Sequence, residues 1–338
     1  NEVFPRLKDL NADGVIMRDS DRLEEILDFG LPVIVIGHYY DRIPGMVNVV
    51  SDCRSISRLA ADHLARCGFR QFGFCGWSDK CWSVDRQNYF CEQLAALGHP
   101  VFVYRPPDFR NAISWKKEQP YVVDWLRSLP KPVGLMTCND DRSQQVVQAC
   151  KIARLKVPEE VAILGVDNDE LICDLSDPPL SSISVNFERA AYEGAAILDE
   201  MMQKREPSRH EIVIQATHVV ARQSTDITAI ENRDVAAAVS FIRTHAHHNI
   251  CVDDVAAVVP LSRRVLEKLF RQYLSTSILQ EIRRVRSQKI AQMLVETNLS
   301  ITQIALELGF QGDEHIARYF RKEMAMSPLQ YRKQYGVK

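Results

Sequence analysis

The sequence predicts an α/β domain built on parallel sheets, followed by a smaller all-α domain that carries two helix-turn-helix units. Three observations predict this organisation. Apolar strands and helices alternate from residue 13 to residue 219, which is the pattern of parallel sheets covered on both faces. Beyond residue 233 every periodic segment has the spacing of a helix. Within that last part, one helix-turn-helix pattern occurs twice.

The α/β part, residues 1–222, shows short apolar runs separated by segments with apolar residues three or four positions apart. Strands are predicted at residues 13–17, 32–36, 47–50, 71–75, 101–104, 134–138, 161–166 and 212–219. Helices are predicted at residues 21–29, 53–66, 84–97, 120–128, 142–153 and 187–203. Their alternation assigns the whole part to one α/β unit.

Residues 223–233 are polar and have no hydrophobic period, so they are predicted to be the linker to a C-terminal domain at residues 234–338. Helices are predicted there at residues 234–245, 252–259, 263–273, 278–296, 301–308, 313–324 and 328–335. The helix at 278–296 lies between the two repeated units and, at 1.5 Å per residue, would be about 28 Å long. A rod of that length can hold two units roughly one DNA turn apart.

The two copies of the repeated pattern are offset by 49 residues before the turn and by 50 after it. In each copy two apolar residues anchor the second helix, Leu266 and Phe270 in the first and Ile316 and Phe320 in the second. The side chains expected to face DNA are Arg263, Arg264, Glu267, Lys268 and Arg271 in the first copy and Asp313, Glu314, His315, Ala317, Arg318, Arg321 and Lys322 in the second. The repeat predicts a protein that binds two adjacent half-sites in double-stranded DNA; the alternative is a helical bundle that binds no nucleic acid.

The charge distribution supports the nucleic-acid interpretation. Residues 229–338 hold 16 Lys and Arg against 11 Asp and Glu, whereas the other residues carry a net charge of −7. No apolar run is long enough to span a membrane, and the nine cysteines include no C-x-x-C pair. The expectation is a cytoplasmic protein with reduced thiols and no membrane partner.

Polar residues follow two buried strands of the α/β part. Cys138-Asn139-Asp140-Asp141 follows the strand at 134–138, and Asp167-Asn168-Asp169 follows the strand at 161–166. Open α/β sheets bind ligands at these carboxyl ends. Together with Arg86, these carboxylates and amides suit the hydroxyls of a sugar; loop capping or a surface ion pair is the alternative for each residue taken alone.

Two segments resemble known families. The C-terminal run Ile301-x-x-Ile304-Ala305 … Gly309-Phe310 … Tyr319-Phe320 … Ser327-Pro328 resembles the AraC/XylS family of transcription regulators, with Gly312 and Pro260 as departures. The runs Ala60-Ala-Asp-His-Leu64, Asn139-Asp140 and Pro158–Asp167 resemble the periplasmic-binding-protein-like effector domain of LacI-type regulators. This resemblance implies a two-lobed sensor that lacks about fifty N-terminal residues of the family domain. It implies that the sugar cleft is lined by Arg86, Asn139, Asp140 and Asp167, with His38, Tyr39 and Trp77 on the other lobe, and that Val185 replaces a ligand-facing Gln.

A LacI-type sensor joined to an AraC-type DNA-binding domain resembles the layout of regulators of xylose operons. The resemblance implies a homodimeric activator of pentose catabolism genes that responds to a small sugar, D-xylose in the first place, with RNA polymerase as a further partner. The alternatives are a repressor, a regulator for another monosaccharide and, more distantly, a sugar-processing enzyme that uses the Asp140/Asp141 and Asp167/Asp169 carboxylates. No cofactor, metal site or enzymatic activity is expected, because His245, His247 and His248 lie around a helix end and no catalytic motif is present.

Overall fold

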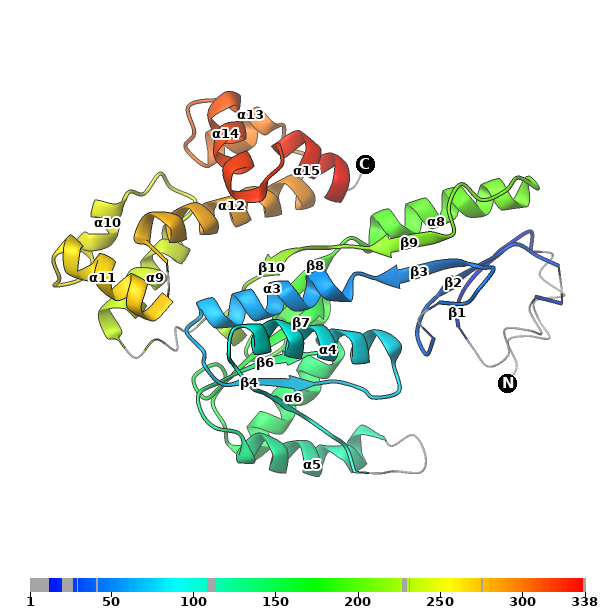
Figure 1. The fold of residues 1–338 in the computed structure, drawn as a ribbon, viewed down its shortest axis with the longest axis horizontal. Helices are drawn as coiled ribbons and strands as arrows, with labels where there is room; N and C mark the ends of the chain where they lie inside the picture. Colours follow the sequence, from blue (N-terminus) through cyan, green and yellow to red (C-terminus); the bar gives the residue numbers. More distant parts are fainter. Residues whose placement is uncertain are drawn as a thin grey trace.

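The computed structural model describes residues 12–19, 27–28, 30–40, 42–107, 114–226, 230, 232–274 and 276–336. They form a sensor of two lobes and a helical domain that lies against it (Figure 1). The helix predicted at residues 21–29 lies outside the described residues at all but two positions. Within the described ranges, no helix has both the length and the apolar character that crossing a membrane requires.

The small lobe contains one parallel sheet in the order β1-β2-β3-β9. Its strands are β1 (Val15–Arg18), β2 (Val33–Ile36), β3 (Val47–Ser51) and β9 (Glu211–Ile214). The helix α8 (Phe187–Met202) covers one face, and its Ala190 and Ile197 pack into the same apolar cluster as Ile34 and Ile212. β2 and β3 are almost entirely buried, which explains their continuous apolar runs.

The large lobe contains a six-stranded sheet in the order β10-β8-β7-β6-β4-β5, in which only β10 is antiparallel to its neighbour. The strands are β4 (Phe72–Cys75), β5 (Val101–Val103), β6 (Val133–Thr137), β7 (Val161–Asp167), β8 (Ser181–Val185) and β10 (Ala216–Val220). Its helices are α3 (Cys53–Arg66), α4 (Cys81–Ala96), α5 (Trp115–Ser128), α6 (Asp140–Ala153) and the short α7 (Glu170–Leu175). α3 and α4 pack in one apolar cluster and α5 and α6 in another, so both faces of the sheet are covered, as predicted.

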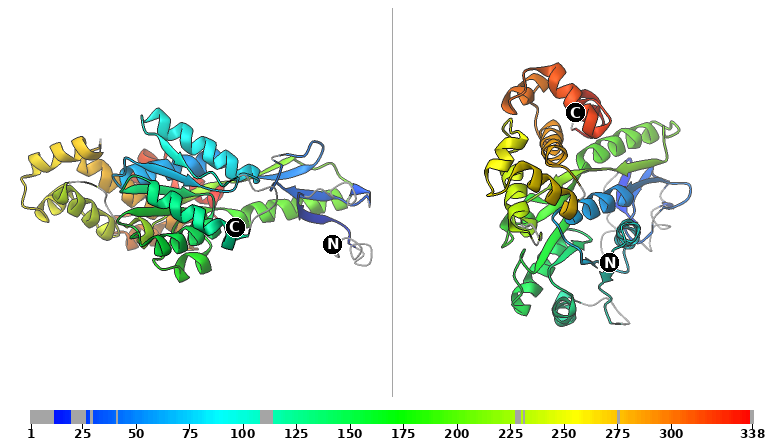
Figure 2. Two further views of the ribbon diagram at one scale, coloured as in Figure 1. Left: turned by 90° about the horizontal axis from the view of Figure 1, so that it is seen from below. Right: turned by 60° about the vertical axis from the view of Figure 1, so that its left-hand side comes forward.

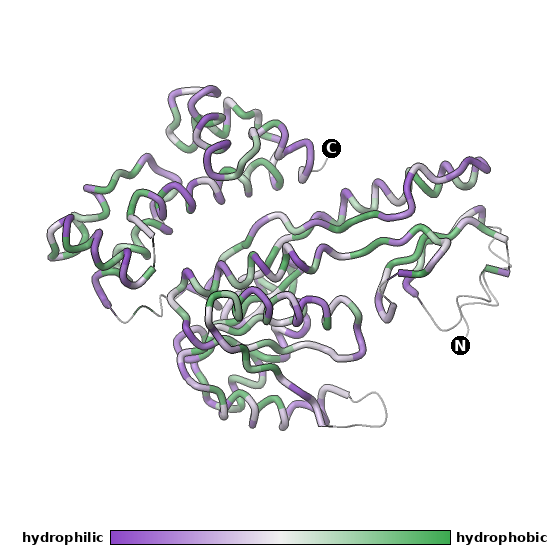
Figure 3. Tube along the Cα trace, in the orientation of Figure 1, coloured by the Kyte–Doolittle hydropathy of each residue, from purple (hydrophilic) through white to green (hydrophobic). Residues whose placement is uncertain are grey.

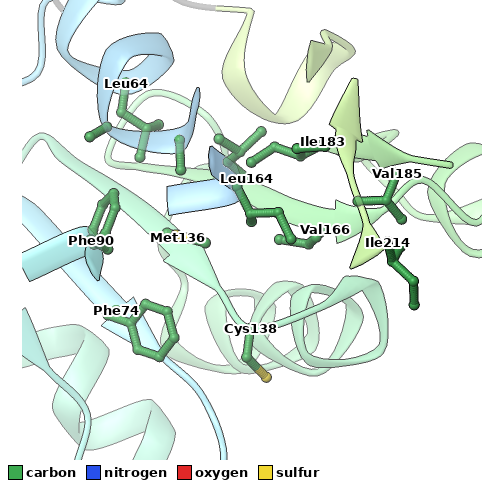
Figure 4. Packing of buried hydrophobic residues seen from close by; sticks show 14 of the residues in the cluster. Leu64, Phe74, Phe90, Met136, Cys138, Leu164, Val166, Ile183, Val185 and Ile214 are labelled. Carbon is green, nitrogen blue, oxygen red and sulfur yellow. The ribbon is translucent and has the colours of Figure 1, made fainter. Parts of the chain in front are cut away.

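In Figure 3 many strand segments are hydrophobic (green) and the outer turns of the helices are hydrophilic (purple), which agrees with this layering. The first cluster is continuous from Leu64, through the aromatic pair Phe74 and Phe90, to Val185 and Ile214 at the junction with the small lobe (Figure 4). The core of the large lobe therefore extends to the point at which the chain crosses between lobes.

The sequence patterns did not predict α7 or β8, and two predicted elements differ markedly in extent. The segment predicted as one strand at residues 212–219 is two strands, because the chain leaves the small-lobe sheet at Gln215 and enters the large-lobe sheet. The helix predicted at 120–128 begins five residues earlier, at Trp115. Pro120 lies inside α5 near its beginning, where its missing N–H removes only one intrahelical bond.

The beginning of the predicted linker is also different from expected. Residues Gln223–Thr225 form a 3₁₀ turn, η2, that is packed into the sensor. Ser224 is fully buried and its Oγ donates to the carbonyl of Ile163 at 2.6 Å, while the hydroxyl of Thr225 lies 2.7 Å from Ser181 Oγ. These hydroxyls are satisfied by the sheet, so this polar segment belongs structurally to the large lobe.

The C-terminal domain consists of seven helices within the described ranges. They are α9 (Arg233–His245), α10 (Val252–Ala257), α11 (Arg263–Leu274), α12 (Ile278–Glu296), α13 (Ile301–Glu307), α14 (Asp313–Met324) and α15 (Pro328–Tyr335). One apolar cluster holds α9, α10 and α11 together and a second holds α13, α14 and α15, with α12 contributing to both. Figure 2 shows the first of these units and the small lobe at opposite ends of the molecule. The predicted double unit on a shared helix is thus confirmed.

Local signals in the sequence explain the ends of these helices. Ser300 Oγ accepts from the amide of Gln303 at 3.1 Å, and the Gln303 side chain accepts from the amide of Ser300, so the start of α13 is a capping box. Gly309, directly after α13, has φ +70°, a left-handed conformation in which glycine is favoured.

Candidate functional site: an interlobe cleft and two exposed helices

A cleft of about 980 Å³ lies between the two lobes of the sensor. The carboxyl ends of parallel strands from both lobes form its walls, as open α/β sheets predict for ligand sites. The small lobe contributes residues after β1, β2 and β3, including Arg18, His38 and Ser51. The large lobe contributes residues after β4, β6 and β7, together with one face of α4.

Arg86, from the buried face of α4, is the central cation of the cleft and is 4 % exposed. Its guanidinium donates to the carbonyl oxygen of Cys138 in the large lobe and, at 3.1 Å, to Ser51 Oγ at the end of β3 in the small lobe. Its Cζ also lies 4.9 Å from the ring centroid of Trp82. One side chain therefore contacts both walls of the cleft.

Asp167 ends β7 and carries the nearest carboxylate to Arg86. Its Oδ1 is 3.7 Å from an Arg86 terminal nitrogen, close enough for an ion pair but too long for a hydrogen bond. Burial raises the pKa of Asp167 to about 6, and the charge of Arg86 only partly opposes that shift. Asp167 and Asn168 have φ values of +105° and +54°, which cost conformational energy in residues other than glycine.

Two buried polar atoms at this pair have no hydrogen-bond partner among the described residues, Asp167 Oδ1 and Arg86 Nε. An unpaired buried donor or acceptor costs about 1–3 kcal/mol. Such atoms in native proteins require an explanation, and a polar ligand in the cleft would supply one. Backbone strain at Asp167 and unsatisfied groups at the same place are both typical of binding sites.

The residues after β6 have two different roles, and the structure corrects the prediction that Asp140 lines the cleft. Asn139 and Asp141 line the cleft, and Asn139 also caps α6 through the amide of Arg142 at 3.0 Å. Asp140 is 1 % exposed and does not line the cleft. Its carboxylate accepts from Ser182 Oγ at 2.7 Å and from the amide of Asp169 at 2.9 Å. It therefore supports the loop that carries Asp167, and burial raises the pKa of Asp140 to about 7.

Gly165 explains how Asp140 can approach that loop. A Cβ at residue 165 would lie 2.1 Å from Asp140 Oδ1, so no larger residue fits without displacing the carboxylate. The sequence run Gly165-Val-Asp167 therefore combines a position that requires glycine with the cleft aspartate two residues later. The resemblance selected Asp140 for the cleft, whereas the structure places Asp141 there, because adjacent residues at a helix start point in different directions.

Aromatic rings form another wall of the cleft. Trp82 Nε1 lies 3.3 Å from His38 Nδ1, and the Trp77 and Trp82 rings meet edge to face with centroids 5.9 Å apart. Burial, followed by the charges of Lys80 and Arg18, lowers the pKa of His38 and so favours the neutral ring. Apolar faces of this kind suit the C–H face of a sugar ring. His38 and Trp77 thus line the cleft, and sequence reasoning missed Trp82, one turn before Arg86 on the same helix.

Tyr39 is the second site residue whose expected position is corrected. It is half exposed and does not line the cleft. Its amide donates to the Asp19 carboxylate at 2.8 Å, and the ammonium of Lys80 lies 3.7 Å from its ring centroid. The rings of the consecutive residues His38 and Tyr39 meet edge to face with centroids 4.9 Å apart, but only His38 lines the cleft.

In the helical domain, α11 and α14 expose the residues that the sequence predicted to face DNA. Leu266 and Phe270 anchor α11, and Ile316 and Phe320 anchor α14; all four are fully buried. Two open, shallow hollows follow the opposite faces of these helices. The first is lined by Arg263, Arg264, Glu267, Lys268 and Arg271, and the second by Glu314, Ala317, Arg318, Arg321 and Lys322. Asp313 and His315 are exposed at the start of α14.

The first residue of each exposed helix contacts the helix before it. Arg263 pairs with Asp253 of α10 at 2.9 Å, and the Asp313 carboxylate accepts from Thr302 Oγ1 of α13 at 2.9 Å. The two units thus repeat the same link between the second residue of one helix and the first residue of the next. Arg318, five residues further along α14, is exposed and lines the second hollow.

Arg286 of α12 connects the two units and is 3 % exposed. It donates to the carbonyl oxygen of His248, in the turn after α9, and at 2.8 Å to the carbonyl oxygen of Leu308, in the turn after α13. Its Cζ lies 4.7 Å from the Phe310 ring centroid. Two main-chain contacts from one buried guanidinium restrict how the units can move relative to each other.

His245, at the end of α9, packs against its own helix. His245 stacks on Phe241 with centroids 4.1 Å apart, and its Nδ1 lies 3.0 Å from the Phe241 carbonyl oxygen. Among the described residues there is no group of three or more His, Cys, Asp or Glu side chains placed to hold a metal ion.

The comparisons with known proteins match both parts of the chain. A family model for a periplasmic binding protein-like domain matches residues 61–225, and one for a helix-turn-helix domain matches residues 255–334. The chain is similar to the xylose operon regulatory protein of Haemophilus influenzae, with 30% identity over 96% of this chain and 86% of that protein. Its similarity to the xylose operon regulatory protein of Escherichia coli K12 is 29% identity over 97% and 85% of the two chains. The solved structure of the xylose-binding transcription activator xylR superposes with a TM-score of 0.57 at 29% identity, covering 96% of this chain and 87% of that one.

Proposed function

This chain belongs to the family of the xylose operon regulatory proteins, and we propose that it is a sequence-specific transcription activator whose effector is D-xylose. The cleft is the observation that best supports sugar binding. Arg86 and Asp167 present unpaired polar atoms there, beside Asn139 and Asp141. DNA binding is best supported by the two exposed basic helices, α11 and α14, which both belong to units that pack on α12.

The cleft chemistry suits a monosaccharide. A sugar hydroxyl both donates and accepts a hydrogen bond, so a carboxylate acceptor beside a guanidinium or amide donor can bind two neighbouring hydroxyls. Asp167 and Arg86 form one such combination, and Asp141 and Asn139 form another. The edges of the sugar would meet these polar groups, while Trp77 and Trp82 cover a ring face.

Sugar binding is tested by calorimetric titration of the full chain with D-xylose and with a panel of other pentoses and hexoses. Asp141→Asn and Asp167→Asn should each weaken D-xylose binding by at least about tenfold, since each removes a charged hydrogen-bond acceptor worth about 1.5–3 kcal/mol. Asp177→Asn is the matched control, because Asp177 is exposed and pairs only with Lys151 at the surface. Tighter binding of another sugar than D-xylose would assign the cleft to that monosaccharide.

DNA binding is tested by fluorescence anisotropy on candidate operator fragments with and without D-xylose. Two basic helices on one rod should protect two half-sites about one helical turn apart, and the affinity should fall steeply with salt. We further propose that the protein acts as a homodimer and contacts RNA polymerase. Sedimentation of the protein–DNA complex and transcription in vitro with purified polymerase test those two statements. Salt-independent binding, or no preference for any promoter fragment, would contradict the DNA-binding proposal.

A further inference from the structure

The short helix α15 lies against the sensor at the hinge between the two lobes. The chain crosses between the lobes at three places, Ser51–Cys53, Val185–Phe187 and Ile214–Ala216, which together we call the hinge. The crossovers are bonded to one another: the amide of Asp52 donates to the Ile214 carbonyl at 2.9 Å, and that of Asn186 to the Gln215 carbonyl at 3.0 Å. Motion of one lobe relative to the other must therefore bend all three together.

The second helix-turn-helix unit binds the large-lobe side of this hinge. Tyr331 of α15 is 3 % exposed, and its hydroxyl donates to the carbonyl oxygen of Thr217 at 3.1 Å. Glu296, the last residue of α12, lies 3.1 Å from His218 Nε2. Thr217 and His218 follow the third crossover directly, at the point where the pairing of β10 with β8 shifts register between Ala216 and His218. Such a bulge is a local irregularity that can change when the strand bends.

The same helix also binds the small-lobe side. Arg189 is the third residue of α8, which packs against the small-lobe strands. Its guanidinium donates to the carbonyl oxygens of Lys333 and, at 2.7 Å, Gln334, both in the last turn of α15. Glu193 orients Arg189 through a 3.0 Å contact one turn along α8. A guanidinium at the carboxyl end of a helix also interacts favourably with the helix dipole.

The first unit has no such double attachment. Between described residues, its hydrogen bonds and ion pairs with the sensor are to α3 and the turn after it, in the large lobe: Arg66 pairs with Glu281 of α12 at 3.9 Å, Arg243 reaches Cys67, and Arg70 donates to the Tyr273 carbonyl at 2.7 Å. Among the described residues, the units therefore differ in that only the second is bonded to both lobes.

The hinge segments that hold α15 also form part of the cleft wall. Ser51, Phe187 and Ile214 line the cleft, and Ser51 Oγ accepts from Arg86. Phe187 lies two residues before Arg189 and Ile214 three residues before Thr217, both of which contact α15, and Figure 1 shows α15 above the region where β3, β8 and α8 meet. Arg189 lies on the small-lobe side of the hinge and Thr217 on the large-lobe side, and α15 contacts both. A ligand that draws the lobes together must therefore change the distance between these two contacts.

We propose that α15 is a strap across the hinge, whose docking holds the lobes at their present separation and restrains the second helix-turn-helix unit. Lobe closure on a sugar breaks the contact on one side and frees the second unit to bind its half-site. This inference rests on the proposed function for the identity of the ligand, but the strap itself is a property of the folded chain. Because coupling is reciprocal, DNA that selects the freed unit must also tighten sugar binding.

The test uses three variants of the full chain. Arg189→Met keeps the aliphatic stem and removes the donors to α15, and Tyr331→Phe removes only the hydroxyl that binds Thr217. Arg70→Met is the matched control, because Arg70 also donates to a carbonyl oxygen in the last turn of a helix, α11 of the first unit, but does so from the turn after α3 in the large lobe. Affinity for a two-half-site operator is measured without sugar and with saturating D-xylose, and hydrogen exchange of the α15 amides is followed in parallel.

Strap variants should bind DNA without sugar nearly as tightly as the wild type does with sugar, and their α15 amides should exchange faster. The ratio of the two DNA affinities, typically about 5–150-fold in coupled systems, should fall to below about twofold, while Arg70→Met keeps the wild-type ratio. Sugar-free DNA affinity and α15 exchange equal to wild type in both strap variants would overturn the strap. If D-xylose does not change the DNA affinity of the wild type, the proposed effector is contradicted. The strap is still tested in that case, because its test uses the measurements made without sugar.

Discussion

The Arg86–Asp167 pair offers a sharp test of the cleft electrostatics, through Arg86→Met alone and combined with Asp167→Asn. Methionine keeps an unbranched apolar stem but removes the guanidinium that lies over Trp82, and it leaves the Asp167 carboxylate without a counter-charge. The same change leaves the Cys138 carbonyl without its donor. In the double variant, a neutral Asn side chain replaces the Asp167 carboxylate, so no unpaired charge remains. The double variant should therefore be more stable than Arg86→Met, although it carries one more substitution.

The distance between the two charges sets the size of this effect. At 3.7 Å and an effective dielectric constant near 20, two unit charges attract by about 4 kcal/mol. Part of that attraction offsets desolvation, and Asp167 retains 27 % of its side-chain exposure, so a coupling of about 1–3 kcal/mol is expected from a double-mutant cycle. Arg86→Met should lose about 3 kcal/mol at pH 7.5, and the Asp167→Asn change should restore about 1–2 kcal/mol of it.

Urea unfolding of the wild type, both single variants and the double variant measures the cycle at several pH values. Burial already raises the pKa of Asp167 to about 6, and loss of Arg86 must raise it further. A carboxyl whose pKa is higher in the folded state contributes stability at low pH that is lost as the pH rises through that pKa. The advantage of the double variant over Arg86→Met should thus shrink from pH 7.5 towards pH 5 and disappear only near pH 4, where the carboxyl is protonated in both the folded and the unfolded state. If Arg86→Met is as stable as the double variant at pH 7.5, the pair is not the electrostatic unit described above.

Three further predictions concern the ligand and DNA. D-xylose affinity should fall about tenfold from pH 7 to pH 5, as protonation of Asp167 removes its acceptor charge; a pH-independent affinity in calorimetry would argue against Asp167 as a ligand contact. Arg318→Ala should cost about 1–3 kcal/mol on the operator and little on random DNA, whereas Lys322→Ala should weaken both alike; equal losses from the two changes would reverse these assignments. Arg286→Met should leave binding to one half-site intact but relax the preferred spacing between half-sites, which anisotropy on operators of graded spacing measures, and an unchanged spacing preference would show that Arg286 does not set it.

Sequence reasoning succeeded where a local pattern is tied to a fixed geometry. The helices α12, α14 and α15 have the bounds that their apolar period and caps predicted, and the turn at Gly309 has the positive φ that its glycine suggested. The anchors Leu266 and Phe270 are buried because residues four apart share one helix face. The domain order, the repeated unit and the basic faces all depend on spacing of this kind.

The expectations that needed correction depend on how distant segments meet. The strand predicted at 212–219 is apolar throughout, and nothing local shows that Gln215 passes from one sheet to another. Asp140 and Asp141 are chemically identical neighbours, and only the packing of Ser182 and Gly165 against α6 turns one of them away from the cleft. Tyr39 is likewise held beside Lys80, an ammonium that only the fold brings to its ring, and it does not line the cleft.

The sequence by itself determined the two domains, the double helix-turn-helix and the polar strand ends that form the large-lobe wall of a cleft, because each rests on short-range periodicity or on residue type. Only the tertiary structure decided that Arg86 contacts both lobes and that α15 lies across their hinge. The α15 contacts join residues more than a hundred positions apart, such as Arg189 with Gln334. The acceptors are main-chain carbonyl groups, which every residue carries, so no pattern of side chains could have predicted these contacts.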